Sequence, residues 1–315
     1  MAQKFTVSAD SSLLKCLFEL FPQQSRTGVK ACLQDGRVVV NGVVRTAFDW
    51  PLRKGDTIEI LPKGVAIGRE MKSDAVTTLK KSGITIVFED EHLIVIEKEA
   101  GVPVRRPKNP EGGRNVKSVQ SLMTDYLHTE KRADIKAGEG SYNAPSRIFV
   151  IHRMDSQASG LMLLAKDERT RDLILSKWDS TILDYRFTTL LEGHPAPQEG
   201  RIESWLTDNA KTSKVFSSHE EGEGLRSVSF YKVTESRKRF SLVEFRPSTI
   251  RRHQIRVHAA VELGHPVAGD RKYGSSANFG GRLAIHASAL TFRNPYGGKV
   301  LTFTSPLPAS FSLLK

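Results

Sequence analysis

The residues best suited to chemistry lie in one polar turn, 152–160, with the sequence His-Arg-Met-Asp-Ser-Gln-Ala-Ser-Gly. Asp155 follows Arg153 closely in this turn, and the apolar run Leu161–Ala165 comes directly after it. A run of this length suits a buried strand and is short for a helix. A carboxylate at the mouth of a buried strand is costly unless it is paired, and paired carboxylates are common in active sites. The alternative is an aspartate that only caps its own turn.

Three later segments also carry reactive side chains. Residues 184–193 have a β-pattern with Tyr185 near its start, and residues 282–287 alternate in polarity and include His286. The richest segment, 251–258, contains Arg251, Arg252, His253, Gln254, Arg256 and His258. Each has a simpler explanation, because Tyr185 could be an edge-strand aromatic and the arginines a phosphate-binding surface.

Metal binding and kinase chemistry fit these segments poorly. The spacing of His253, His258, His265 and His286 matches no HExxH or Cys/His pattern, so we expect no metal site. The His-Arg-Met-Asp run is similar to the kinase catalytic loop, but the Gly-rich loop and the Asp-Phe-Gly motif are missing.

Strands and helices that would position these groups can be read from residue 83 onward. The pattern there predicts an α+β domain of many strands, with helices over 116–128 and 254–263 and a loop over 130–145. If 252–256 were helical, Arg252 and Arg256 would share a face. The expected strands are 84–88, 92–97, 161–165, 185–191, 227–233, 240–245 and 301–304.

Residues 1–62 are predicted to form a separate small α/β domain, and 63–82 a linker. Helices are expected after Ser11 or Ser12 and from Ser25 to about Gln34, followed by short strands around Asn41-Gly42 and after Lys54-Gly55-Asp56. This unit has 8 Lys/Arg against 6 Asp/Glu, so any RNA-binding face must be local. The candidates are Arg26, Lys30, Arg37 and Arg45.

Composition favours a nucleic-acid partner. The 315 residues carry a net charge of +12, which suits polyanions. Cys16 and Cys32 form no CxxC motif, and no signal-peptide core or run of 18 apolar residues is present. We therefore expect a cytoplasmic protein with no membrane partner.

Taken together and in order, the segments resemble the RluA-type family of RNA pseudouridine synthases. The family pattern His-Arg-Leu-Asp-x-x-Thr-Ser-Gly is met at 152–160, Thr-Gly-Arg-x-His-Gln-Ile-Arg-x-His at 249–258, Gly-His-Pro-Ile-x-Gly-Asp-x-x-Tyr-Gly at 264–274 and Leu-x-Leu-His-Ala at 283–287. The resemblance covers about 84–308, and residues 1–62 are similar to S4-type RNA-binding domains.

The resemblance implies a mixed, largely antiparallel β-sheet catalytic domain over 83–315, flanked by helices. It also implies that no cofactor is needed and that Asp155 acts as nucleophile or base, with Arg256 as counter-ion. Tyr185 would stack on the uracil and take part in removing the C5 proton, and Ile285 would form the opposite wall. Substrate contacts are expected from Arg153, Arg251, His253 and Gln254. The RNA backbone would be held by basic residues at 105–117, including Arg105 and Arg106, and at 237–252.

Three departures from the family pattern bear on substrate choice and activity. Ala158 replaces the usual Thr, Ile250 replaces a Gly, and Leu183 stands where a Lys is common. The resemblance favours structured RNA as substrate, with large-subunit ribosomal RNA before tRNA. A monomer is the default expectation, because the sequence does not indicate the oligomeric state. The rival hypotheses are an RNA-binding or assembly factor with weakened catalysis, and a glycoside hydrolase, for which no second acid motif is present.

Overall fold

The computed structural model describes residues 3–34, 37–41, 43–44, 48–60, 73–106, 116–136, 147–209 and 211–312. The chain divides into two compact units, one of residues 1–73 with 88–90 and one of 74–87 with 91–315. Within the described ranges, no helix has the length and apolar character needed to cross a membrane.

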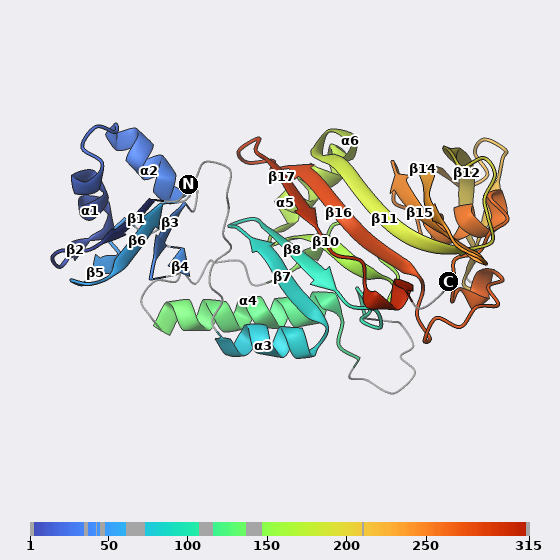
Figure 1. The fold of residues 1–315 in the computed structure, drawn as a ribbon, viewed down its shortest axis with the longest axis horizontal. Coiled ribbons are helices and arrows are strands. Elements are labelled where there is room, and N and C mark those ends of the chain that lie inside the picture. Colours follow the sequence, from blue (N-terminus) through green and yellow to red (C-terminus); the bar gives the residue numbers. More distant parts are fainter. Residues whose placement is uncertain are drawn as a thin grey trace. The chain divides into compact units, whose positions relative to one another are not determined.

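The first unit packs two helices on a small antiparallel sheet (Figure 1). Its apolar core includes Leu13, Leu17, Val29, Val38 and Ile58. The apolar faces of the two helices and of the sheet therefore pack against one another. The sheet order is β1-β6-β3-β4, and β2 pairs with β5. The elements are β1 Gln3–Thr6, β2 Ser11–Ser12, α1 Leu13–Leu20, α2 Arg26–Gln34, β3 Val38–Val40, β4 Val43–Val44, β5 Pro51–Leu52 and β6 Thr57–Ile60.

The second unit is built on one large sheet of eleven strands, ordered β13-β12-β14-β15-β11-β16-β10-β8-β7, with β9 beside β10 and β17 beside β16. From β13 to β8, only the neighbours β10 and β16 run parallel. The strands are β7 Ile84–Glu89, β8 Leu93–Lys98, β9 Phe149–Val150, β10 Ser159–Ala165, β11 Ile182–Glu192, β12 Glu199–Asn209, β13 Lys214–Ser218, β14 Leu225–Ser236, β15 Phe240–Pro247, β16 Ile285–Arg293 and β17 Val300–Thr304.

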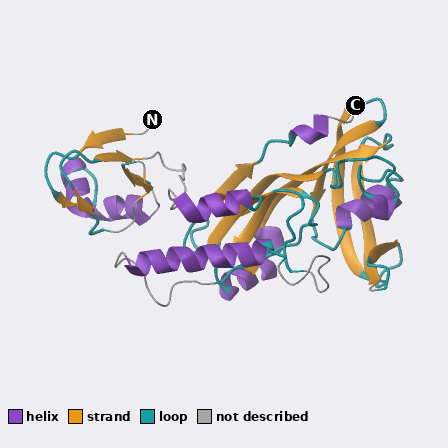
Figure 2. Ribbon diagram, turned by 90° about the horizontal axis from the view of Figure 1, so that it is seen from below, coloured by secondary structure: helices purple, strands orange, loops and turns teal. Residues whose placement is uncertain are grey.

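Helices border this sheet. The α-helices are α3 Ser73–Lys81, α4 Val119–Lys136, α5 Glu168–Ser176, α6 Trp178–Thr181 and α7 Gln254–Val257, and π-helix η1, His258–Glu262, continues α7. Helices α3 and α4 lie side by side near β7 and β8 in both ribbon views (Figures 1 and 2). Short 3-10 turns complete the unit at η2, Arg271–Tyr273, and η3, Ala309–Ser312.

The α+β class with a largely antiparallel mixed sheet is confirmed, and all seven expected strands are present. Strand β10 is buried at every residue, as the apolar run predicts. Two expectations were wrong: α4 continues to residue 136 into the predicted loop, and α3 occupies the end of the predicted linker. The helix expected over 254–263 is confirmed by α7 and η1, and because it begins at Gln254, Arg252 is not on it. Strands β1, β12 and β13 and helices α5 and α6 were not predicted.

Candidate active site

Asp155 lies at a cavity of about 530 Å³ over the middle of the large sheet. The cavity is lined from four neighbouring strands or the loops at their ends: the 152–158 turn before β10, β11, the loop after β15, and the start of β16. A second cavity of about 560 Å³ shares Asp155, Ser156, His253 and Arg256 with it. Asp155 therefore stands between the two.

The turn that carries Asp155 is held mainly through its backbone. Lys98, fully buried at the end of β8, donates to the carbonyl oxygens of Glu99 at 2.9 Å, Ser156 at 3.0 Å and Ala158 at 2.6 Å. Burial lowers the pKa of Lys98 to about 7, against the opposing influence of Asp155. The buried ammonium group of Lys98 therefore holds the backbone of this turn in place.

The two ends of this motif are also fixed. The buried His152 accepts a hydrogen bond at Nε2 from the Leu163 amide at 3.0 Å, and burial lowers its pKa to about 4. Gly160 has φ of +110°, and a Cβ there would lie 2.4 Å from the Ala287 carbonyl oxygen of β16. Only glycine allows this close approach of β10 and β16.

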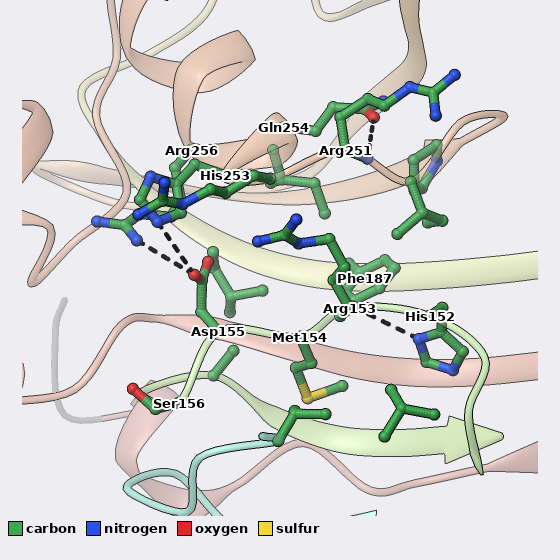
Figure 3. Close-up of a pocket in the computed structure, with 18 of the residues that line it drawn as sticks. His152, Arg153, Met154, Asp155, Ser156, Phe187, Arg251, His253, Gln254 and Arg256 are labelled. Atoms are coloured by element: carbon green, nitrogen blue, oxygen red, sulfur yellow. Dashed lines mark hydrogen bonds and ion pairs between the residues drawn. The ribbon is translucent and has the colours of Figure 1, made fainter. Parts of the chain in front are cut away.

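The carboxylate of Asp155 points toward α7 (Figure 3). Its Oδ1 lies 3.4 Å from Arg256 Nη1 and 3.4 Å from His253 Nε2. Because the partners come from another segment of the chain, Asp155 is more than an aspartate that caps its own turn. The pairing with Arg256 agrees with the expected counter-ion.

Arg256 is shared between two carboxylates. Its Nε and Nη2 donate to the two oxygens of buried Asp270 at 2.6 and 2.7 Å, a bidentate pair. Burial would lower the pKa of Arg256, but the hydrogen bonds to Asp270 and the charge of Asp155 raise it. Arg256 is therefore a permanent cation whose tightest partner is Asp270.

The aromatic side chain at the cavity is Phe187, and Tyr185 is not among the lining residues. Tyr185 is buried, donates its hydroxyl to the Leu161 carbonyl at 2.8 Å, and packs its ring on His152 and Phe187. Burial raises its pKa well above the usual value. The geometry therefore corrects the role expected of Tyr185, since its hydroxyl does not reach the cavity.

The geometry of β11 shows how Phe187, two residues after the expected Tyr185, comes to be the aromatic residue at the cavity. Tyr185 and Phe187 share one face of the strand, and the pairing of β11 with β16 is irregular between Arg186 and Phe187. Bulges redirect side chains and recur beside active sites. Ile285 lines the same cavity from β16, as expected, and the adjacent His286 is instead buried between Ser159 and Ser305.

Gln254 borders the cavity but is fully engaged by the protein. Its Oε1 accepts from Thr249 Oγ1 and the Arg251 amide, both at 3.0 Å. Its Nε2 donates to Val228 and Ser229 at 3.0 and 2.9 Å. The geometry therefore gives Gln254 a role in shaping this loop and does not support the expected contact with substrate.

The predicted cationic residues fall into two groups. Arg105, Arg153, Arg251 and Arg252 line the cavity, and Arg153 extends across it (Figure 3). Arg252 also pairs with Asp208 at 3.1 Å, and away from the cavity Arg237 pairs with Glu235 and Arg246 with Glu244, which divides the expected basic stretch 237–252. Arg106 is exposed but is not a lining residue of the cavity.

In the first unit, Arg26 and Lys30 are exposed and lie over the rings of Phe18 and Phe48 at 5.6 and 5.9 Å. Arg37 Nη1 lies 3.4 Å from Cys32 Sγ. Arg45 is outside the described residues.

The sequence interpretation missed four residues of the site: Lys98, Phe187, Asp270 and Tyr273. Asp270 and Tyr273 belong to the 264–274 block, so their spacing was visible although no role was given to them. Lys98 had no signal in the sequence beyond being a lysine at the end of an apolar strand.

Comparisons with known proteins agree on one family. Residues 92–261 match the model for RNA pseudouridylate synthase. An uncharacterized RNA pseudouridine synthase of Bacillus subtilis is 27% identical over 293 residues, covering 92% of this chain and 88% of its own. Ribosomal large subunit pseudouridine synthase D of Zymomonas mobilis is 30% identical over 240 residues, covering 73% of this chain and 71% of its own.

A solved structure shares the fold. The protein titled Human RNA Pseudouridylate Synthase Domain Containing 4 superposes with a TM-score of 0.55 at 21% identity. The match covers 76% of this chain and 94% of the human one.

Proposed function

Because the chain belongs to the RNA pseudouridylate synthase family, we propose that it converts uridine to pseudouridine at the cavity beside Asp155, in large-subunit ribosomal RNA. The family resemblance predicted from the sequence is confirmed, and the chain is an isomerase acting on RNA. The observation that carries the proposed site is the Asp155 carboxylate, 26% exposed, beside Arg256 and at the mouth of a partly apolar cavity.

The reaction breaks the bond between uracil N1 and ribose C1′, turns the base, and joins C5 to C1′. Substrate and product contain the same atoms, so no cofactor is required. Asp155 starts the reaction as a nucleophile at the sugar or as the base that removes a ribose proton. Arg256 places a positive charge beside this carboxylate, and its bond to Asp270 keeps that charge in place.

The uracil would lie between apolar side chains. Phe187 offers a ring for stacking from β11 and Ile285 an aliphatic contact from β16. Phe187 has no ionisable group, and the Tyr185 hydroxyl is already bonded to a carbonyl. In this chain the aromatic contact would therefore bind the base without accepting the C5 proton.

A uridine in folded RNA must leave its stack to reach Asp155, at a cost of a few kcal/mol. Arg153 suits the place left behind, because it lies in the reactive turn two residues before Asp155 and its side chain extends into the cavity. Among the residues that the structure describes, no hydrogen bond or ion pair is assigned to its guanidinium group. Arg105 and Arg251 line the same cavity and would hold phosphates, whereas Arg252 is paired with Asp208.

Large-subunit ribosomal RNA is favoured as substrate by the name of the Zymomonas relative and by the sequence resemblance of residues 1–62 to S4-type RNA-binding domains. We propose that residues 1–62 add an RNA contact through Arg26 and Lys30. Their exposed side chains lie over aromatic rings and remain available for phosphates.

The test uses ribosomal RNA labelled with tritium at uracil C5, made in cells that lack the protein. Isomerisation releases the label into water. The wild-type protein should release tritium. In Asp155→Asn the rate of release should be at least about 10⁴-fold lower, because the chemistry starts at this carboxylate. No release by wild type would favour the assembly-factor alternative, whereas release by Asp155→Asn would refute the role of Asp155.

A further inference from the structure

The two oxygens of the Asp155 carboxylate have different surroundings. Both described contacts, to His253 Nε2 and Arg256 Nη1, are made by Oδ1. Within the described part of the chain, no hydrogen bond or ion pair is assigned to Oδ2. One oxygen is therefore held by the protein and the other remains available to a substrate.

His253 reaches Oδ1 from an unusual backbone position. It precedes α7 with φ of +52°, a left-handed conformation uncommon for residues other than glycine. Its side chain is only 8% exposed. Such strained residues persist where the surrounding structure over-determines them, often at active sites.

Tyr273 contacts the ring nitrogen of His253 that faces away from Asp155. The Tyr273 hydroxyl oxygen accepts a hydrogen bond from the Val215 amide at 2.8 Å. The same oxygen lies 2.8 Å from His253 Nδ1, and because the Asp155 carboxylate can only accept at Nε2, we assign the hydroxyl proton to the bond toward Nδ1. A neutral imidazole that accepts at Nδ1 carries its proton on Nε2, the nitrogen that faces Asp155.

His253 is neutral in this setting. Burial lowers its pKa to about 3, and the nearby charges of Arg256, Arg252 and Lys272 act in the same direction. His253 therefore offers Asp155 a hydrogen-bond donor without a second full positive charge.

We propose that Tyr273 and His253 are positioning residues for the reaction. The chain from the Val215 amide through the Tyr273 hydroxyl and the His253 ring fixes Oδ1 of Asp155, so that Oδ2 is the oxygen that reacts with the uridine. The inference rests on the role proposed above for Asp155. The contact of 3.4 Å is expected to shorten when substrate excludes water.

Two substitutions at His253 separate donation to Asp155 from a structural role. The amide nitrogen of Gln can occupy the place of Nε2, whereas that of Asn occupies the place of Nδ1. Asn is the residue better suited to a positive φ. A purely structural role therefore predicts that His253→Asn is the more active variant, and the positioning role predicts the opposite.

We expect His253→Gln to keep kcat within about 10-fold of wild type and His253→Asn to lose about 100-fold, with KM for RNA nearly unchanged, as for loss of a donor that matters in the transition state. Thermal unfolding of both variants shows whether they fold. If His253→Asn is folded and at least as active as His253→Gln, the proposal is wrong.

The tautomer can be measured independently of activity. Nitrogen-15 NMR of the imidazole rings should show His253 protonated at Nε2 and bare at Nδ1, with its signal identified by its loss in His253→Asn. Tyr273→Phe should mix the two tautomers and lower kcat about 10-fold. A proton on Nδ1 in wild type would overturn the proposal, even if the Asp155→Asn result upholds the catalytic carboxylate.

Discussion

At the scale of single residues, two neighbouring aromatic side chains of the site have different roles: Tyr185 packs in the core and Phe187 faces the cavity. Tyr185 and Phe187 lie two positions apart on one face of β11, and only Phe187 lines the cavity. Sequence spacing could not choose between them, because both suit a half-buried strand. The choice depends on the ring of His152, which packs on Tyr185, and on the irregular pairing with β16 at Arg186–Phe187, and both are tertiary features.

Substitution of these two aromatics should have opposite consequences. Phe187→Ala should lower kcat/KM for RNA by about 100-fold, in the range of a lost base–aromatic stack. Tyr185→Phe should leave kcat/KM within about 3-fold and lower the free energy of unfolding by about 1 kcal/mol, since it removes one buried hydrogen bond. Tritium release and urea unfolding measure the two effects. Greater loss of activity in Tyr185→Phe would restore the expected role of Tyr185.

At the scale of elements, the sequence predicted the position of the reactive turn better than it predicted the segments that hold this turn in place. Asp155 and Arg256 were paired correctly because their segments belong to ordered motifs. The helix predicted over 254–263 is present as α7 and η1, but Arg252 and Arg256 do not share a helical face, because His253 adopts a left-handed conformation and α7 starts after it. The left-handed conformation of His253 has no signal in the periodicity, and it coincides with a functional side chain.

Lys98 at the end of β8 should give the reaction an upper pH limit. Its ammonium group uses three protons on three carbonyls, and burial lowers its pKa to about 7. The protonated form, present below pH 7, holds the turn. As the pH rises through about 7, Lys98 loses a proton and with it one of its three hydrogen bonds. The nitrogen lone pair then faces a carbonyl oxygen and repels it. Because this loosens the turn that carries Asp155, kcat should fall.

The pH profile of kcat, measured by tritium release, checks this expectation. Lys98→Met should lower kcat by at least about 10-fold at pH 6, since it removes three charge-assisted hydrogen bonds under Asp155. It should also abolish the decline near pH 7. A decline that persists in a folded Lys98→Met protein would assign the titration to another group.

At the scale of the whole molecule, composition and charge predicted the partner class, and motif order predicted the family. The sequence could not show which basic residues are available, because that depends on which side chains the fold brings within reach of a carboxylate. Arg246 and Glu244, two apart on β15, hold each other at 2.8 Å. Arg153 in the cavity has no such ion pair assigned among the described residues.

This difference should appear in the salt dependence of RNA binding, measured with Asp155→Asn protein to prevent turnover. Each phosphate contact contributes close to one unit to the slope of log K against log salt. Arg153→Ala should reduce the slope by about 1. Arg246→Ala should change it far less, because its charge is largely neutralised by Glu244 and a surface pair of this kind contributes little. Equal changes in the two variants would mean that RNA contacts the sheet surface around β15 as closely as it contacts the cavity, and would refute the place given to Arg153.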